Sequence, residues 1–231
     1  MSALLETVDL DPPRPTATDL IFDSLYDRIL TLDLPPGTRM SEAEVARALG
    51  VSRQPVRDAF WRLSKLGFLT VRPQRATTVS PISEDAVRQA QFIRASVETE
   101  TVRVAVARLT DADLAALDVV LDLQAEAVAA REKERFHALD EAFHREICER
   151  AGLGFAWALV RENKAQMDRA RFLSLSFGLQ TALNEHRVIL DALRARDEAT
   201  AVAAMRVHLG RILLDLPRIR ADNGRYFGDE D

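Results

Sequence analysis

Four residues in the second half of the chain have side chains that bind transition metals. Asp140 and His144 lie four positions apart, which places both on one face of a helix and within reach of one ion. His186 and His208 follow, each in an apolar stretch that is expected to be helical. Three imidazoles and one carboxylate that converge inside a helical bundle would suit Zn²⁺, Ni²⁺ or Mn²⁺.

Spacing alone leaves a second interpretation open, in which these are four unrelated buried or surface residues. An Asp–His pair at positions i and i+4 is often a simple hydrogen bond. His137 competes for the same role, since it lies one turn before Asp140 on nearly the same face. It would be ~10.5 Å from His144 along the helix axis, so the two cannot bind one ion. We favour His144 and expect His137 to be solvated.

A second group of residues is suited to bind a polyanion. The net charge of the 231-residue chain is −5, yet residues 39–75 include eight basic and only three acidic side chains. Within this window, Arg53, Gln54 and Arg57 lie opposite an apolar stripe. Arginine can donate two hydrogen bonds to guanine, and glutamine suits adenine or a phosphate. Trp61, one turn further on, is expected to pack on a neighbouring helix or a partner subunit. A solvated helix surface would explain the charge alone equally well.

Three short helices surround this basic window. Apolar periodicity predicts a first helix after Thr18 as its N-cap, and a second that begins with a capping box formed by Ser41 and Glu44. The third helix begins after Ser52, and the second ends at Gly50. Two short helices joined by so tight a turn are typical of a helix-turn-helix.

A small hairpin is expected directly after these helices. Residues 68–72 and 77–81 are β-branched or apolar runs on either side of a proline-containing turn. Arg72 and Arg75 lie at this turn, where they would clamp phosphate or reach the minor groove. Helices and hairpin together predict a winged helix-turn-helix in the first eighty residues.

The remainder of the chain, from Glu84 to about Ala221, is helical in pattern almost throughout. About six helices of ordinary length are expected, which predicts an antiparallel α-helical bundle. The breaks between helices are expected at Leu109–Thr110, Ala130–Arg131, Gly152–Gly154, Ser176–Gly178 and Arg196–Asp197.

Composition supports a mainly α-helical, cytoplasmic protein. The chain is 47% hydrophobic and 29% charged, which excludes a disordered or fibrous chain. No apolar run reaches the ~18–20 residues of a membrane span. Acidic residues and the lack of an apolar stretch argue against a secretory signal in residues 1–20. Cys148 is the single cysteine, which suits a reducing compartment.

The helix-turn-helix carries a specific resemblance. Leu34-Pro35-Pro36-Gly37 and Leu49-Gly50-Val51-Ser52-Arg53-Gln54-Pro55-Val56-Arg57-Asp58-Ala59 resemble the N-terminal domain of GntR-family transcriptional regulators. The similarity extends over about residues 20–81. It implies base and phosphate contacts by Arg53, Gln54 and Arg57.

Residues 84–220 are similar to the helical effector domain of the FadR subfamily, which is called FCD. Asp140-x-x-x-His144, His186 and His208 match the metal-ligand pattern of that domain in order and approximate spacing. Residues 92–98 match its first helix, in which an arginine commonly meets a ligand carboxylate. The resemblance therefore implies Arg94 as the effector anchor, a role that suits a guanidinium.

The sequence leaves the role of two further arginines in the expected bundle open. Arg169 and Arg171 would be able to line the same cavity as Arg94. We favour a solvated or salt-bridged face for both.

These observations predict a flexible arm (residues 1–17), a winged helix-turn-helix (18–82), an all-helical effector-binding and dimerisation domain (83–221) and a tail (222–231). We expect a DNA-binding transcriptional regulator, by default a repressor, that is controlled by a small carboxylate metabolite at the metal site. Two recognition helices one DNA turn apart would require a homodimer and a near-palindromic double-stranded operator. A regulator whose signal is the ion itself is the first alternative. A metal-dependent enzyme is less favoured, because no nucleophile motif is present.

Overall fold

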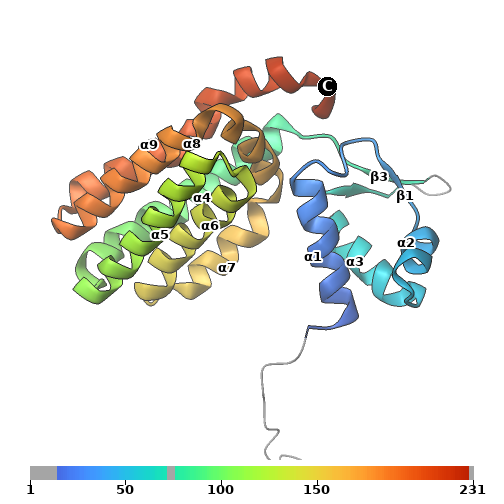
Figure 1. Cartoon of the computed structure of the whole chain (residues 1–231), viewed down its shortest axis with the longest axis horizontal. Coiled ribbons are helices and arrows are strands. Elements are labelled where there is room, and N and C mark those ends of the chain that lie inside the picture. The colour runs from blue at the N-terminus through green and yellow to red at the C-terminus, as the bar shows by residue number, and fades with distance from the viewer. Residues whose placement is uncertain (1–14, 72–75, 229–231) are drawn as a thin grey trace, which may run out of the picture.

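The computed structural model describes residues 15–71 and 76–228, and these form two groups of elements that lie side by side (Figure 1). The smaller group is built from the N-terminal segment. Its elements in chain order are α1 (Ala17–Leu30), β1 (Arg39–Met40), α2 (Glu42–Leu49), α3 (Arg53–Lys65), β2 (Leu69–Thr70) and β3 (Thr77–Val79). The strands form one antiparallel sheet in the order β1-β3-β2.

Local hydrogen bonds start α1 slightly earlier than the sequence predicts. Thr16, rather than Thr18, is the N-cap, and it forms a capping box with Asp19. The capping box predicted at Ser41 is wrong, since the Ser41 side chain makes no capping hydrogen bond. The predicted tight turn between α2 and α3 is present, and Gly50 closes it in the left-handed region at φ 66°.

The core of this N-terminal group lies between α1, α3 and the sheet. Ile29, Val56, Leu63 and Phe68 are fully buried there. Ala165, the first residue of α8 in the C-terminal group, belongs to the same apolar cluster. The small domain therefore completes its core with a side chain from outside its own segment.

The larger group is an antiparallel bundle of long helices, followed by a short 3₁₀ helix. Its elements are α4 (Glu84–Arg108), α5 (Asp111–Ala130), α6 (Lys133–Arg150), α7 (Gly154–Asn163), α8 (Ala165–Arg194), α9 (Glu198–Asn223) and η1 (Gly224–Tyr226). Helix α4 packs against α6, α7, α8 and α9, which gives it the central position. The predicted fold class, a winged helix-turn-helix plus an α-helical bundle, is confirmed.

One predicted break in the bundle is wrong. Helix α8 continues through Ser176–Gly178, and the chain instead turns between α7 and α8 at Lys164. The hydroxyl of Ser176 donates to the backbone carbonyl of Leu173, so this serine is satisfied inside the helix. Neither glycine nor proline marks the turn at Lys164, which explains why the sequence pattern did not predict it.

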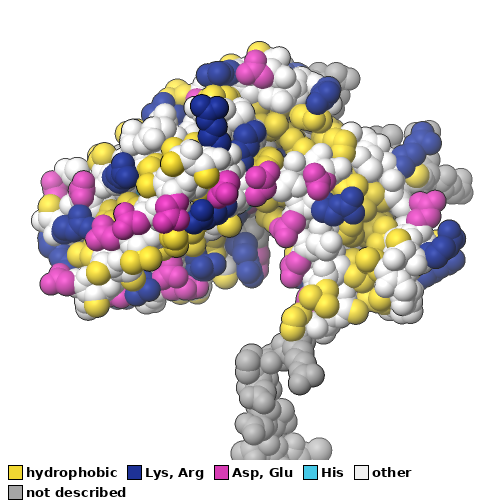
Figure 2. All heavy atoms as spheres, in the orientation of Figure 1, with side chains coloured by type: hydrophobic (Ala, Val, Ile, Leu, Met, Phe, Trp, Pro, Cys, Tyr) yellow, Lys and Arg dark blue, Asp and Glu magenta, His cyan; other side chains and the backbone are white. Residues whose placement is uncertain are grey.

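The surface of the bundle is mixed in charge. In the face shown in Figure 2, acidic and basic side chains are interspersed over the bundle, and basic side chains lie at the far-right edge over the winged helix. None of the described helices is long and apolar enough to cross a membrane.

Replacing Gly50 by alanine should destabilise the protein by roughly 1–2 kcal/mol, because a Cβ is strained at positive φ. Space is not the reason, since no atom lies within 4 Å of the added Cβ. Gly178→Ala is the matched control. This glycine also has open space around its Cβ position but lies inside α8, so alanine should stabilise the protein by about 0.5–1 kcal/mol. Urea denaturation of both variants measures the two free energies, and changes of equal sign would contradict this account.

Candidate metal and effector site

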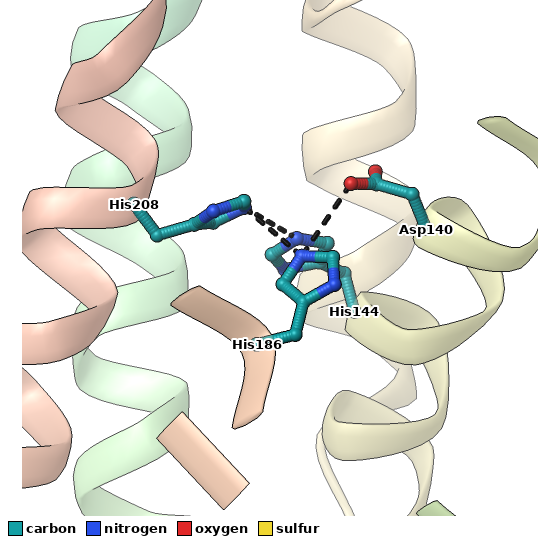
Figure 3. Close-up of side chains that lie close together, drawn as sticks. All are labelled: Asp140, His144, His186 and His208. Carbon is teal, nitrogen blue, oxygen red and sulfur yellow. Dashed lines mark hydrogen bonds and ion pairs between the residues drawn. The ribbon is translucent and has the colours of Figure 1, made fainter. Parts of the chain in front are cut away.

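The four predicted metal ligands meet in the middle of the bundle. Asp140 and His144 come from α6, His186 from α8 and His208 from α9, and all four are buried. Each offers one ligand atom, and these atoms lie within 4.8 Å of one another. Figure 3 shows the three imidazoles and the carboxylate turned toward one another. The structure thus brings together residues that span almost seventy positions of sequence.

The imidazole nitrogens that face the centre are all Nε2. The Nε2 atom of His208 lies 3.1 Å from that of His144 and 3.3 Å from that of His186. The Nε2 atom of His186 also lies 3.4 Å from Oδ1 of Asp140. Three nitrogen atoms and one oxygen atom therefore face the same small volume.

The opposite nitrogen of each imidazole faces an acceptor from the surrounding helices. Nδ1 of His144 lies 2.5 Å from Oε2 of Glu98 on α4, and Nδ1 of His208 lies 3.1 Å from Oε2 of Glu185 on α8. Burial would raise the pKa of Glu98, but Arg94 and His144 lower it to about 2. Against the effect of burial, hydrogen bonds from His208 and Arg211 lower the pKa of Glu185. Both carboxylates are therefore ionised at neutral pH and can only accept.

The third acceptor is an amide oxygen. Nδ1 of His186 lies 2.8 Å from Oε1 of Gln124 on α5. The other end of this amide is fixed, because Nε2 of Gln124 donates to the carbonyl of Leu139 at 3.1 Å. The oxygen of Gln124 must therefore face the imidazole. Hydrogen bonds of this kind fix the tautomer and the ring orientation of metal-binding histidines.

These contacts determine where the protons lie. With Nδ1 protonated on all three rings, each Nε2 presents a lone pair toward the others and toward the carboxylate of Asp140. Protonation of a ring is opposed by burial, which lowers the pKa of His208 to about 4 and that of His186 well below its usual range. Burial would raise the pKa of Asp140, but the positive charge of Arg171 holds it well below its usual range. Converging lone pairs and a negative charge without an intervening proton fit a divalent cation.

A cavity of about 270 Å³ opens beside the four donors. Arg94, Asp140, Arg171 and His208 are among the residues that line it. The Arg94 guanidinium pairs with Glu98 through Nε, whereas its buried Nη2 has no hydrogen-bond partner among the described residues. A buried guanidinium nitrogen that is left unpaired beside a cavity can donate to an acidic ligand.

Of three neighbouring residues, two lie elsewhere than the sequence predicts, and the third, Arg171, is salt-bridged as predicted. His137 is buried rather than solvated, with its ring edge-on to Phe172, and it lines the cavity. Arg171 also lines the cavity and pairs with Asp140 and Glu141. Arg169 is fully buried against the winged helix, and it is not among the residues that line the cavity.

A second group of metal-type side chains, His137, Glu141 and Asp168, lies nearby with ligand atoms within 4.8 Å of one another. The ammonium of Lys164 already lies 2.5 Å from Oε2 of Glu141 and contacts Asp168 as well. A fixed cation thus occupies the position between the carboxylates, and this group is an ion-pair cluster.

The predicted DNA-reading residues of α3 are presented to solvent. Arg53, Gln54 and Arg57 are exposed at its N-terminal end. Arg57 pairs with Glu42 of α2 at 3.3 Å, and Gln54 donates to Asp58 at 2.9 Å.

Two further predictions for this surface have different outcomes. Trp61 is 61% exposed, so it is not packed into its own chain, and its packing on a partner subunit stays a prediction. Arg72 and Arg75 lie outside the described residues.

The residues that orient the site were not predicted from the sequence. Glu98 was visible as the i+4 partner of Arg94, and Glu185 directly precedes His186. Gln124 is the single amide side chain of α5 and is fully buried, and burial of such a residue is a signal that it has a specific partner.

Comparisons with known proteins agree with this architecture. Residues 17–79 match the family of bacterial regulatory proteins called gntR, and residues 89–211 match the FCD domain. The HTH-type transcriptional repressor RspR of Escherichia coli strain K12 is 34% identical over 223 residues, which cover 96% of this chain and 97% of RspR. An HTH-type transcriptional regulator from an unstable DNA locus of Streptomyces ambofaciens is 36% identical over 216 residues, covering 91% and 89%.

The fold is shared with solved structures as well. E. coli McbR/YncC superposes with a TM-score of 0.75 at 23% identity, over 88% of this chain and 98% of that protein. The resemblance of the two segments to the GntR and FCD domains is therefore confirmed. The chain is a DNA-binding transcriptional regulator of the GntR family with a C-terminal FCD domain.

Proposed function

We propose that the protein is a repressor whose affinity for its operator is set by a small carboxylate metabolite bound beside a divalent metal ion in the FCD domain. The observation that carries this proposal is the convergence of three imidazole lone pairs and the Asp140 carboxylate beside a cavity that Asp140 and His208 line. Arg94 presents an unpaired guanidinium nitrogen to the same cavity. RspR, a relative over nearly the whole chain, is itself named a repressor.

The donor set indicates which ions would bind. Imidazole nitrogens and one carboxylate suit Zn²⁺, Ni²⁺ or Mn²⁺, and Asp140, His144, His186 and His208 would hold the ion. When bound, the ion supplies a Lewis-acidic centre that attracts carboxylate oxygens. Arg94 would orient the same ligand from the side, and together they would select small acids.

The cavity limits the size of the effector. A volume of about 270 Å³ lies below the ~300–1,000 Å³ that is usual for drug-sized ligands. It therefore favours a short mono- or dicarboxylate or a sugar acid over a long acyl chain. We infer an effector of this kind, and we assign the chain to the FadR subfamily.

Operator binding would use two copies of the chain. In a homodimer, two α3 helices would present Arg53, Gln54 and Arg57 to a near-palindromic site in the cytoplasm. Large exposed apolar side chains on the neighbouring helices α4 and α9, such as Phe92 (71% exposed) and Leu214 (73% exposed), support a surface for a second copy.

A second candidate function is a regulator for which the ion itself is the signal. It is favoured by Asp140, whose carboxylate is shared between the donor set and Arg171, so an arriving ion would change a buried ion pair directly. Metal-dependent catalysis has weaker support, because all four donors are used as ligands and the relatives are regulators.

Removing either a ligand or its orienting partner should weaken metal binding to different extents. His186→Ala should abolish stoichiometric metal uptake, because one of four donors is lost. Gln124→Ala should lower metal affinity by about 10–100-fold, because the imidazole loses the acceptor that orients it. Metal content after dialysis, measured by mass spectrometry, and titration calorimetry give both values.

His137→Asn is the matched control for this experiment. His137 is a buried histidine of the same helix as His144, but it is not one of the four donors. The variant should retain the wild-type metal content. Equal loss of metal in the His137 and His186 variants would show that the ligand set is wrong.

A thermal-shift screen with small mono- and dicarboxylates and sugar acids, with and without chelation, tests the effector site. An acid present at a hundred times its Kd should stabilise the protein by about 2.7 kcal/mol. For a chain of this size, that raises Tm by roughly 5–10 °C. Arg94→Lys keeps a positive charge beside Glu98 but removes the guanidinium. The acid response should disappear in this variant while metal content stays normal.

The outcomes of the screen separate the candidate functions. A shift from an acid that persists after chelation would contradict the metal-dependent site. A large shift from metal alone, with no response to any acid, would favour the ion as signal.

Arg57→Ala should weaken binding to an operator selected from random DNA by roughly 5–150-fold and relax the preference at one base pair. Arg88→Ala is the control, because Arg88 is an exposed arginine that also pairs with a glutamate but lies on the bundle. Electrophoretic mobility shift at fixed salt gives both affinities. An equal effect of the two substitutions would contradict the assignment of α3 as the recognition helix.

A further inference from the structure

The first two turns of α8 lie between the winged helix and the metal site. Ala165 packs in the apolar core of the winged helix, and Nε2 of Gln166 donates to the carbonyl of Gly67 at 2.5 Å. Nη2 of Arg169 donates to the carbonyl of Ser80 at 2.9 Å. Within the five residues 165–169, three thus contact the DNA-binding domain.

Arg169 makes this docking costly. Its side chain is fully buried beside Phe68, with 5.7 Å between Cζ and the ring centroid, and it forms no ion pair with a carboxylate among the described residues. Its Nε atom also has no hydrogen-bond partner there. Burial lowers the pKa of Arg169 to about 10. A buried cation without a counter-ion opposes docking, so the docked arrangement depends on the remaining contacts.

One of those contacts joins the winged helix to a charged side chain of α8. The hydroxyl of Tyr26 on α1 donates to Oδ2 of Asp168 at 3.4 Å. The ring of Tyr26 is held by Phe22 and Phe68, with centroids 5.8 and 5.1 Å away. Burial and the charge of Asp168 raise the pKa of Tyr26 well above its usual value, so the hydroxyl keeps its proton and remains a donor.

Asp168 is linked in turn to the metal donors through one guanidinium. Nη1 of Arg171 lies 3.6 Å from Oδ1 of Asp168 and 3.1 Å from Oε1 of Glu141. Nη2 of the same arginine contacts Oδ2 of Asp140. The other oxygen of Asp140 is the one that faces His186. One carboxylate is therefore shared between the metal donors and the ion pairs that reach the winged helix.

We propose that Asp140, Arg171, Asp168 and Tyr26 form a latch through which occupancy of the FCD site controls docking of the winged helix. This inference rests on the proposed function, since it assumes that an ion or an acid occupies the site. Arg171 also lines the cavity, so a carboxylate that enters there competes with Asp168 for the same guanidinium. Occupancy redistributes the pairing of Arg171, and Asp168 transmits that change to the hydroxyl of Tyr26.

The latch can act only if the winged helix adopts two arrangements relative to the helical bundle. A ligand shifts such an equilibrium only by its different affinity for the two arrangements. The uncompensated charge of Arg169 keeps the docked arrangement from being strongly favoured, which leaves the balance sensitive to one or two polar contacts. Orientation of the recognition helix α3 follows the docking of its domain.

Tyr26→Phe tests the latch, because it removes the hydroxyl and keeps the ring between Phe22 and Phe68. Hydrogen–deuterium exchange is measured over residues 17–30 and 66–70 of the full chain, without metal and with Zn²⁺, Ni²⁺ or Mn²⁺ in turn. In the wild type, the bound ion should change exchange in both segments. In the variant, the ion should bind with the same stoichiometry, while the change at the two segments falls by about two- to tenfold, as for the loss of one hydrogen bond.

Tyr226→Phe is the matched control, because within residues 15–71 and 76–228 the hydroxyl of Tyr226 accepts from Arg225 alone. It should keep the wild-type response. Asp168→Asn, which removes the charge at the other end of the contact, should reproduce the effect of Tyr26→Phe.

Each other outcome overturns the inference in a distinguishable way. A wild-type response in Tyr26→Phe means that the hydroxyl transmits nothing. A wild-type protein that binds metal without a change at the two segments contradicts the latch and leaves the metal site standing. A wild-type protein that binds none of the three ions contradicts the proposed function, and the latch with it.

Discussion

The orientation of three imidazole rings by Glu98, Gln124 and Glu185 is the constraint on which the centre of this protein depends. The three acceptors come from α4, α5 and α8, and the rings come from α6, α8 and α9, so these contacts tie together five of the six long helices. A buried polar group that loses its partner is costly, so these contacts favour the observed orientation of the rings. In that orientation the Nε2 atoms converge.

Much of this architecture was predictable from the sequence, for reasons that are local. The glycine between α2 and α3 and the apolar stripe of α3 specify the helix-turn-helix, because both act over a few residues. The i, i+4 spacing of Asp140 and His144 fixes them on one face of a helix, and four histidines leave few combinations. Spacing and resemblance led us to expect that the four donors converge, and in the structure their ligand atoms lie within 4.8 Å of one another.

What the sequence did not show is decided by tertiary contacts. The turn at Lys164 carries no glycine or proline to mark it, and the side chain of Lys164 pairs instead with Asp168 one turn later and with Glu141 of α6. Arg169 and Arg171 are two positions apart on one helix, so they face different parts of the molecule. Arg169 contacts the winged helix and Arg171 contacts Asp140, and the sequence does not indicate which arginine faces which part. His137 was expected in solvent because an isolated histidine usually is, and only the packing of α8 across α6 buries it.

The position of Ala165 in the apolar core of the winged helix has a consequence for the recombination of domains between such regulators. The DNA-binding module as a folded object includes a piece of chain encoded about eighty residues after its last strand. A chimaera cut between β3 and α4 would place the first turn of a foreign α8 against Phe68 and Gly67, where a larger residue than alanine would overfill the site. Recombination between family members is therefore constrained at two separate places in the gene, and the first turn of α8 should be inherited together with the winged helix.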